Sequence, residues 1–150
     1  MKMITKITIA LLFAFMGMGS MTEVNAQFLD KKGFVVGAYS YDYIDAGETV
    51  TTKCDQAYSI SLTDKMLCHT IYVDGYIDQS QLYQLSNIEK FMDGENTIIK
   101  ITATSGMTGK TYDYKLSIGA DGKLIALSLT DKDGAINYHG DLLEMKTFVQ

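Results

Sequence analysis

Arginine, proline and tryptophan are absent from this sequence, and cysteine and histidine occur only twice each. Bidentate recognition of phosphate depends on the planar guanidinium of arginine, and nucleic-acid binding needs a basic patch. The net charge of −5, carried without any arginine, therefore excludes a nucleic-acid partner. The same charge argues against binding to anionic membrane surfaces. Without tryptophan the chain also lacks the side chain best suited to stacking on a sugar ring.

The few cysteines and histidines limit the metal and nucleophile chemistry that is open to this chain. They show none of the spacings typical of zinc sites, so we expect no metal and no cofactor. Cys68 and His69 are neighbours in a predicted strand, where adjacent side chains point to opposite faces. They cannot form a nucleophile–base pair with each other, and we expect no catalytic residues. A hydrogen-bonded position in the core or at its rim is the expected role of His69.

One acidic segment has features of a calcium site. Asp131-Lys132-Asp133-Gly134 resembles the middle of a calcium-binding loop, but the first and last ligand positions would fall on Leu129 and Gly140, which supply no ligand. A hairpin turn is therefore predicted here. An irregular site that adds Asp141 to the two turn aspartates is the alternative. A hydrolase built on carboxylates that meet only in the folded chain is a weaker possibility.

The amino terminus has the three parts of a secretory signal peptide. Lys2 and Lys6 precede an uncharged apolar run at residues 7–18, and side chains of small or moderate size follow at Val24 and Ala26. We predict a signal peptide over residues 1–26, cleaved before Gln27.

The apolar run is too short for a permanent membrane anchor. At 1.5 Å per residue it forms a helix of about 18 Å, against a hydrocarbon core of about 30 Å. The remaining chain, residues 27–150, is predicted to be a single domain in the periplasm or the medium.

Cys54 and Cys68 would then face an oxidising compartment, where one disulfide is expected more often than two free thiols. Such a bond would close a loop of about 15 residues and stabilise the fold by about 3 kcal/mol. The alternative is two separately buried thiols.

Turn signals recur along the chain. Asp-Gly pairs favour type I′ hairpin turns, in which both central residues take positive φ. Four such pairs and one glycine-rich segment are present: Asp74-Gly75, Asp93-Gly94, Asp121-Gly122, Asp133-Gly134 and residues 105–109. Between the later signals, apolar and polar residues alternate, which is typical of strands with one buried face. Residues 97–140 are therefore predicted to form a four-stranded antiparallel meander.

The first half is less regular. Strands are predicted at residues 34–44, 49–53, 57–62 and 66–73, with a final strand at 142–149. Between them the spacing of Leu82, Leu85, Ile88 and Met92 is near that of a helix, and Gly94 stands where a helix would stop. We predict a short helix at residues 79–92, with another strand as the alternative. The fold is thus mainly β, either a small lipocalin-like antiparallel barrel or a β-sandwich of about eight strands with at most one short helix.

Tyrosine is the residue type that points most directly to function. The ten tyrosines outnumber the phenylalanines, and in the first strand alternation puts three tyrosines opposite the face of Phe34 and Val36. Tyrosine combines apolar area with a polar group, which suits ligand pockets and protein interfaces. The alternative is that these rings only cover a sheet face. The candidate ligand-binding residues are Tyr39, Tyr41, Tyr43, Tyr112 and Tyr114.

Together these features predict an exported, non-enzymatic binding module of the bacterial envelope. Its ligand would be a small apolar or amphipathic molecule held in a tyrosine-lined barrel mouth. The alternative is an interaction protein that docks onto another envelope protein through the tyrosine row or a sheet edge.

Overall fold

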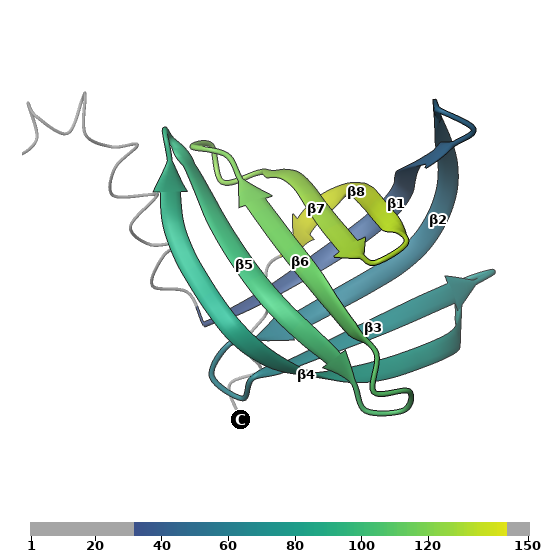
Figure 1. The fold of residues 1–150 in the computed structure, drawn as a ribbon, viewed down its shortest axis with the longest axis horizontal. Coiled ribbons are helices and arrows are strands. Elements are labelled where there is room, and N and C mark those ends of the chain that lie inside the picture. Colours follow the sequence, from purple (N-terminus) through teal and green to yellow (C-terminus); the bar gives the residue numbers. More distant parts are fainter. Residues whose placement is uncertain (1–31, 144–150) are drawn as a thin grey trace, which may run out of the picture.

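The computed structural model describes residues 32–143, which form one closed antiparallel barrel (Figure 1). Each strand pairs with the next, and the last pairs with the first. The strands are β1 (Gly33–Asp45), β2 (Glu48–Ser61), β3 (Met66–Val73), β4 (Tyr76–Asp93), β5 (Asn96–Ser105), β6 (Thr111–Ile118), β7 (Leu124–Asp131) and β8 (Gly134–Leu143). The prediction of a small antiparallel barrel is confirmed, and the sandwich alternative is excluded.

Two predictions fall mainly outside the described residues. The signal peptide and its cleavage site precede residue 32. The strand expected at residues 142–149 overlaps only the last two residues of β8. Within residues 32–143, no helix is long and apolar enough to cross a membrane.

The turns follow the local chemistry of the chain. Asp74 and Gly75 take φ values of 51° and 79°, as a type I′ turn between β3 and β4 requires. Ala46 and Gly47 do the same between β1 and β2, where no Asp-Gly pair signals the turn. The predicted four-stranded meander corresponds to β5–β8. The two strands expected at residues 49–53 and 57–62 are continuous in β2.

The predicted helix at residues 79–92 is wrong, because this segment lies in the 18-residue strand β4. A β-bulge between Ser86 and Glu89 explains the misleading spacing. Asn87 there has φ of 48°, and the extra residue shifts the alternation, so the inward positions are Leu85 and then Ile88. The resulting three-residue step resembles a helical period, although the chain is extended.

A second bulge, in β1, changes the faces of the tyrosine row. Pairing with β8 moves from Ala38↔Gly140 to Ser40↔His139, which leaves Tyr39 as the extra residue. Tyr39 is 58% exposed, whereas Tyr41 beyond the bulge packs against the core. The prediction that all three tyrosines lie opposite the buried face is therefore wrong.

One half of the barrel interior is filled by aliphatic side chains. Fully buried members come from six different strands: Val36, Ile60, Leu67, Ile99, Leu116, Ile118 and Leu127. Burying each such side chain contributes about 1.5–3 kcal/mol. This half lies at the end of the barrel with the β2–β3, β4–β5 and β6–β7 turns. Its packed side chains close that end, and we call them the floor.

Candidate functional site

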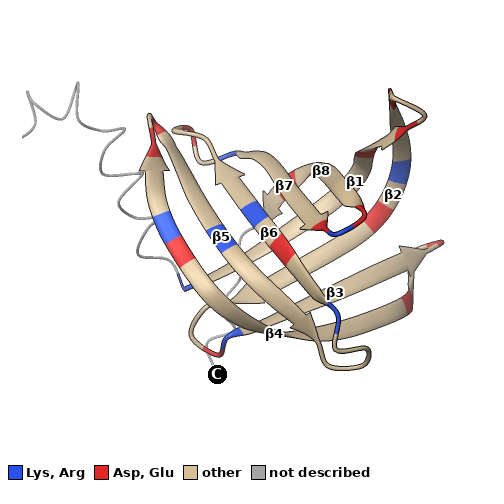
Figure 2. Cartoon of the chain, viewed as in Figure 1, with Lys and Arg blue, Asp and Glu red and all other residues tan. Residues whose placement is uncertain are grey.

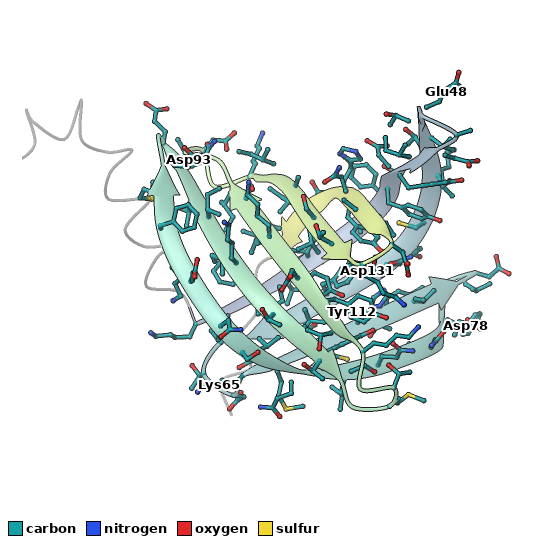
Figure 3. The ribbon with its side chains drawn as sticks, viewed as in Figure 1. Glu48, Lys65, Asp78, Asp93, Tyr112 and Asp131 are labelled. Carbon is teal, nitrogen blue, oxygen red and sulfur yellow. The ribbon has the colours of Figure 1, made fainter. Side chains whose placement is uncertain are left out.

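The other half of the interior is lined by aromatic and amide side chains. It opens between the β1–β2, β3–β4, β5–β6 and β7–β8 hairpins, and we call this end the mouth. Figure 3 labels Glu48, Asp78, Tyr112 and Asp131 at the mouth, with Lys65 and Asp93 at the opposite end. Because successive side chains in a strand alternate between faces, the same strands that fill the floor with aliphatic groups also direct tyrosines into the mouth.

A cavity of about 160 Å³ lies in the mouth, above the aliphatic floor. None of the residues that line it is an aspartate, a glutamate or a lysine. The lining residues are Tyr58, His69, Ile71, Gln79, Gln81, Tyr83, Tyr112, Tyr114, Leu129 and Tyr138. The cavity therefore presents aromatic area together with hydroxyl, amide and imidazole groups.

A hydrogen-bond network centred on Gln56 fixes one wall of the cavity. Its Oε1 accepts a hydrogen bond of 3.1 Å from the hydroxyl of Tyr58 and lies 2.8 Å from Nε2 of His69. Since an amide oxygen only accepts, Nε2 of His69 carries the hydrogen. Burial lowers the pKa of His69 to about 4, so the imidazole is neutral near pH 7 and its Nδ1 is an acceptor.

Tyr58 and Tyr114 in the mouth keep their hydroxyls protonated. Burial, with a smaller effect from neighbouring tyrosines, raises the pKa of Tyr58 and of Tyr114. The hydroxyl of Tyr83 donates a hydrogen bond of 2.6 Å to Oε1 of Gln81. Tyr114 is only 4% exposed, and within residues 32–143 no hydrogen-bond partner is found for its hydroxyl. This buried donor lines the cavity.

The rings of the mouth pack mainly against one another. Tyr58 stacks on His69 at 4.4 Å and meets Tyr138 and Tyr114 in tilted or edge-on contacts at 5.2 and 6.0 Å between ring centroids. Tyr83 meets Tyr112 edge-on at 6.0 Å. Such aromatic pairs contribute about 0.5–1.5 kcal/mol each beyond area burial. The wall of the cavity is consequently fixed by packing as well as by hydrogen bonds.

A wider groove of about 630 Å³ lies beside the mouth, between the β1–β2 and β7–β8 hairpins. Its lining includes Tyr43, Ile44, Ile136 and the carboxylates of Asp42 and Asp131. Leu129 lines both the groove and the mouth cavity, so the two spaces adjoin.

The structure divides the five predicted tyrosines among four environments. Tyr112 and Tyr114 line the mouth cavity, and Tyr43 lines the adjoining groove. Tyr41 lies between them, with its ring 5.7 Å from that of Tyr138 and 5.9 Å from that of Tyr43. Tyr39 stands apart on the outer surface.

Sequence reasoning missed most of the cavity wall. Tyr58, Tyr83 and Tyr138 were not singled out, although each occupies an inward position of its strand. A usable signal for Tyr58 was its alternation with Ile60 and Leu62. His69 has the role expected of it, a hydrogen-bonded histidine at the rim of the core.

The predicted disulfide between Cys54 and Cys68 is not formed, and both cysteines are free. Strand register gives the physical reason. Cys68 in β3 pairs with Ser59, which lies several residues along β2 from Cys54. The side chain of Cys54 packs against the core. The thiol of Cys54 is 3.6 Å from the carbonyl oxygen of Ala38, and that of Cys68 is 3.8 Å from the hydroxyl of Thr70 on the outer face.

The acidic segment at residues 131–134 forms a hairpin turn. Oδ1 of Asp131 accepts hydrogen bonds from the backbone N–H groups of Asp133 and Gly134, at 2.8 and 3.1 Å. Asp141 pairs with Gly37, far from this turn. In the described part of the chain, no three potential ligand side chains are grouped for a metal ion, and the buried polar residues are Thr97 and Ser105 rather than carboxylates.

Charged residues occur along the strands and at the hairpin ends (Figure 2), and none of those in the described part of the chain is buried. Around the mouth, carboxylates outnumber lysines. The turn regions at this end carry Asp45, Glu48, Asp74, Asp78, Asp131 and Asp133, with Lys110 and Lys132. The mouth therefore combines an uncharged lining with an acidic rim.

No family model, curated protein sequence or solved structure matches this chain. The chemistry of the mouth is accordingly the basis for interpreting its function.

Proposed function

We propose that this protein is a non-enzymatic binding module that holds a small amphipathic molecule in the tyrosine-lined mouth of its barrel. The observation that carries the proposal is the cavity of about 160 Å³, lined by five tyrosines, two glutamines and His69 around aliphatic side chains. Ligand sites are typically concave and mostly apolar, with a few polar groups that fix orientation. The aliphatic floor and the Gln56 network hold this wall in place without a ligand, which lowers the entropic cost of binding.

The proposed setting is the bacterial envelope or the medium. Its support is the signal-peptide pattern of residues 1–26. Mass determination of the protein recovered from cells tests this part. A mass that begins at Gln27 supports export, whereas a mass that includes Met1 contradicts it.

Native mass spectrometry of the protein recovered from cells tests the binding function. We expect a small molecule to be retained and released on denaturation. Retention of another protein instead would favour a docking function. The proposal would be contradicted if every preparation gave the mass of the protein alone and the protein bound no small molecule from a metabolite extract.

Two matched tryptophan variants connect any retained molecule to the mouth. Ile71→Trp adds volume to a residue that lines the cavity, whereas Ile125→Trp adds the same volume at a side chain on β7 that is 50% exposed. We expect Ile71→Trp to abolish retention and Ile125→Trp to preserve it. Equal retention by both variants would place the ligand elsewhere.

Docking through a sheet edge is the second candidate, and one observation favours it. Pairing of β2 with β3 ends at Gln56↔Ile71, so the outer part of β2 continues beyond its neighbour. Figure 1 shows the β1–β2 hairpin diverging from the β3–β4 hairpin. Exposed backbone donors and acceptors of this kind can accept an added strand. The tyrosine row no longer supports docking, because Tyr39 is separated from Tyr41 and Tyr43.

A further inference from the structure

We propose that the mouth cavity selects an uncharged molecule about the size of one six-membered ring, with a hydroxyl or carbonyl group that hydrogen-bonds to Tyr114. This inference rests on the proposed function and names the class of ligand. Three properties of the cavity support this inference independently: its volume, the buried hydroxyl donor without a partner, and the lack of groups that would stabilise a charged ligand.

Volume limits the ligand to a single ring. An apolar protein cavity of about 150 Å³ is known to hold benzene, and the mouth cavity is about 160 Å³. Below it, the interior is closed by packed side chains that include Leu116 and Leu127. A second fused ring would have to displace these residues, extend past Leu129 into the adjoining groove or protrude from the mouth.

Tyr114 supplies the polar anchor. Its side chain is more than nine-tenths buried and its hydroxyl has no partner within residues 32–143. Buried polar groups in folded proteins are nearly always hydrogen-bonded, because an unsatisfied one is costly. By contrast, the hydroxyls of Tyr58 and Tyr83 already donate to glutamine oxygens. An acceptor on the ligand would satisfy Tyr114 and orient the ring.

Charge is disfavoured in both signs. Burial in this wall already lowers the pKa of His69. A cation at this depth therefore loses more free energy of hydration than its interactions with the surrounding side chains return. Tyr58 stacks its ring face on His69, and the other rings meet in tilted or edge-on contacts, so they do not converge as a cage for an ammonium group. Anions meet the acidic rim and find no lysine in the lining.

Four probe molecules test size and charge together. The full chain, labelled with ¹⁵N, is titrated at pH 7 with phenol, benzoate, phenyltrimethylammonium and 2-naphthol. We expect phenol to shift the amide signals of lining residues such as Tyr112 and Leu129. The other three probes should bind at least about tenfold more weakly. No binding of phenol, or equal binding of any other probe, overturns the inference.

Two tyrosine variants test the anchor. Tyr114→Phe removes only the hydroxyl and should weaken phenol binding about fivefold to tenfold, the effect of one hydrogen bond. Tyr76→Phe, at a residue that is 79% exposed and outside the lining, should leave it unchanged. Thermal unfolding of both variants verifies that they fold. Unchanged affinity in folded Tyr114→Phe overturns the anchoring role and with it the inference.

The outcomes distinguish failure of this ligand selectivity from failure of the proposed binding function. If benzoate, phenyltrimethylammonium or 2-naphthol shifts the same lining residues as strongly as phenol, the selectivity is wrong and the binding function stands. If no probe shifts any lining residue and native mass spectrometry finds no retained molecule, both fail.

Discussion

The imidazole of His69 lies parallel to the ring of Tyr58, with centroids 4.4 Å apart and planes 4° apart. Gln56 joins the pair from the side, since its Oε1 accepts from the Tyr58 hydroxyl and from Nε2 of His69. The three side chains come from two neighbouring strands and form one rigid wall of the mouth. Protonation of His69 is therefore coupled to folding, and it gives the first prediction.

We expect the stability of the protein to fall in mild acid because of His69. Burial lowers its pKa in the folded protein from the ordinary 6.5 to about 4, so the unfolded chain takes up the proton first. As pH falls from 6.5 to 4, the free energy of unfolding should decrease by at most about 1.4 kcal/mol per pH unit. Urea unfolding across this range measures the slope.

The matched variant for this prediction is His69→Gln, which retains a donor for Gln56 but does not titrate. Its unfolding free energy should depend less on pH over the same interval. His139→Gln, at a half-exposed histidine on the outer face, should keep the slope that is due to His69. A slope that survives His69→Gln unchanged would contradict the assignment.

Closure of the barrel depends on Gly140. An added Cβ at this position would overlap the carbonyl oxygen of Gly37 and approach Cα of Ala38 to 2.9 Å, because β1 and β8 come close together beside the bulge. Gly140→Ala should lower the free energy of unfolding by more than about 2 kcal/mol. At Gly106 the nearest atom to an added Cβ is the carbonyl oxygen of Leu82, at 3.6 Å. Gly106→Ala should therefore change the free energy of unfolding by less than about 0.5 kcal/mol. Equal unfolding midpoints in urea would contradict this account.

The bulge in β4 depends on the left-handed backbone of Asn87, whose φ is 48°. Asn87→Gly should be tolerated or slightly stabilising, whereas Asn87→Val should cost about 1–2 kcal/mol, because a β-branched residue disfavours this conformation. Ser86→Val is the control, since the neighbouring residue is in ordinary extended backbone and is exposed. Thermal unfolding of the three variants measures the difference. A loss in Ser86→Val as large as in Asn87→Val would point to a cause other than the positive φ.

Both cysteines should be titratable as thiols. Protein purified without reductant and then denatured should react with a chromogenic disulfide reagent at two thiols per chain. In the folded protein Cys54 should react slowly, because burial and the nearby Asp55 raise the pKa of its thiol. Cys68→Ser should remove the faster phase. A thiol titre near zero in the denatured protein would show that the two cysteines form a disulfide after all.

Asp42 on the outer face should titrate below its ordinary pKa of 3.8. The hydrogen bond from the hydroxyl of Thr51, at 2.6 Å, is the largest cause, followed by the interaction with Nε2 of His139. Thr51→Val should therefore raise the pKa of Asp42, as measured by carboxyl carbon NMR. Thr111→Val, which alters a threonine pair on β5 and β6, should leave it unchanged. A shift of equal size in both variants would show that the effect is not local.

The bulges mark the limit of what alternation can predict. The rule that neighbours on a strand face opposite sides holds on either side of Tyr39 and of Asn87, but one extra residue inverts the phase beyond each. In β4 the inversion imitated a helix, and in β1 it moved Tyr41 from the expected outer row to the interior. A bulge is set by the register with a neighbouring strand, so alternation within one strand does not signal it.

The sequence by itself determined the strand-rich fold, the later meander and the placement of Tyr112 and Tyr114 in the mouth, because alternation and turn chemistry are local properties. Only the tertiary structure decided closure into a barrel, the separation of Cys54 from Cys68 and the union of Tyr58 with His69. These depend on strand register, and register is set by interactions between residues far apart in the chain.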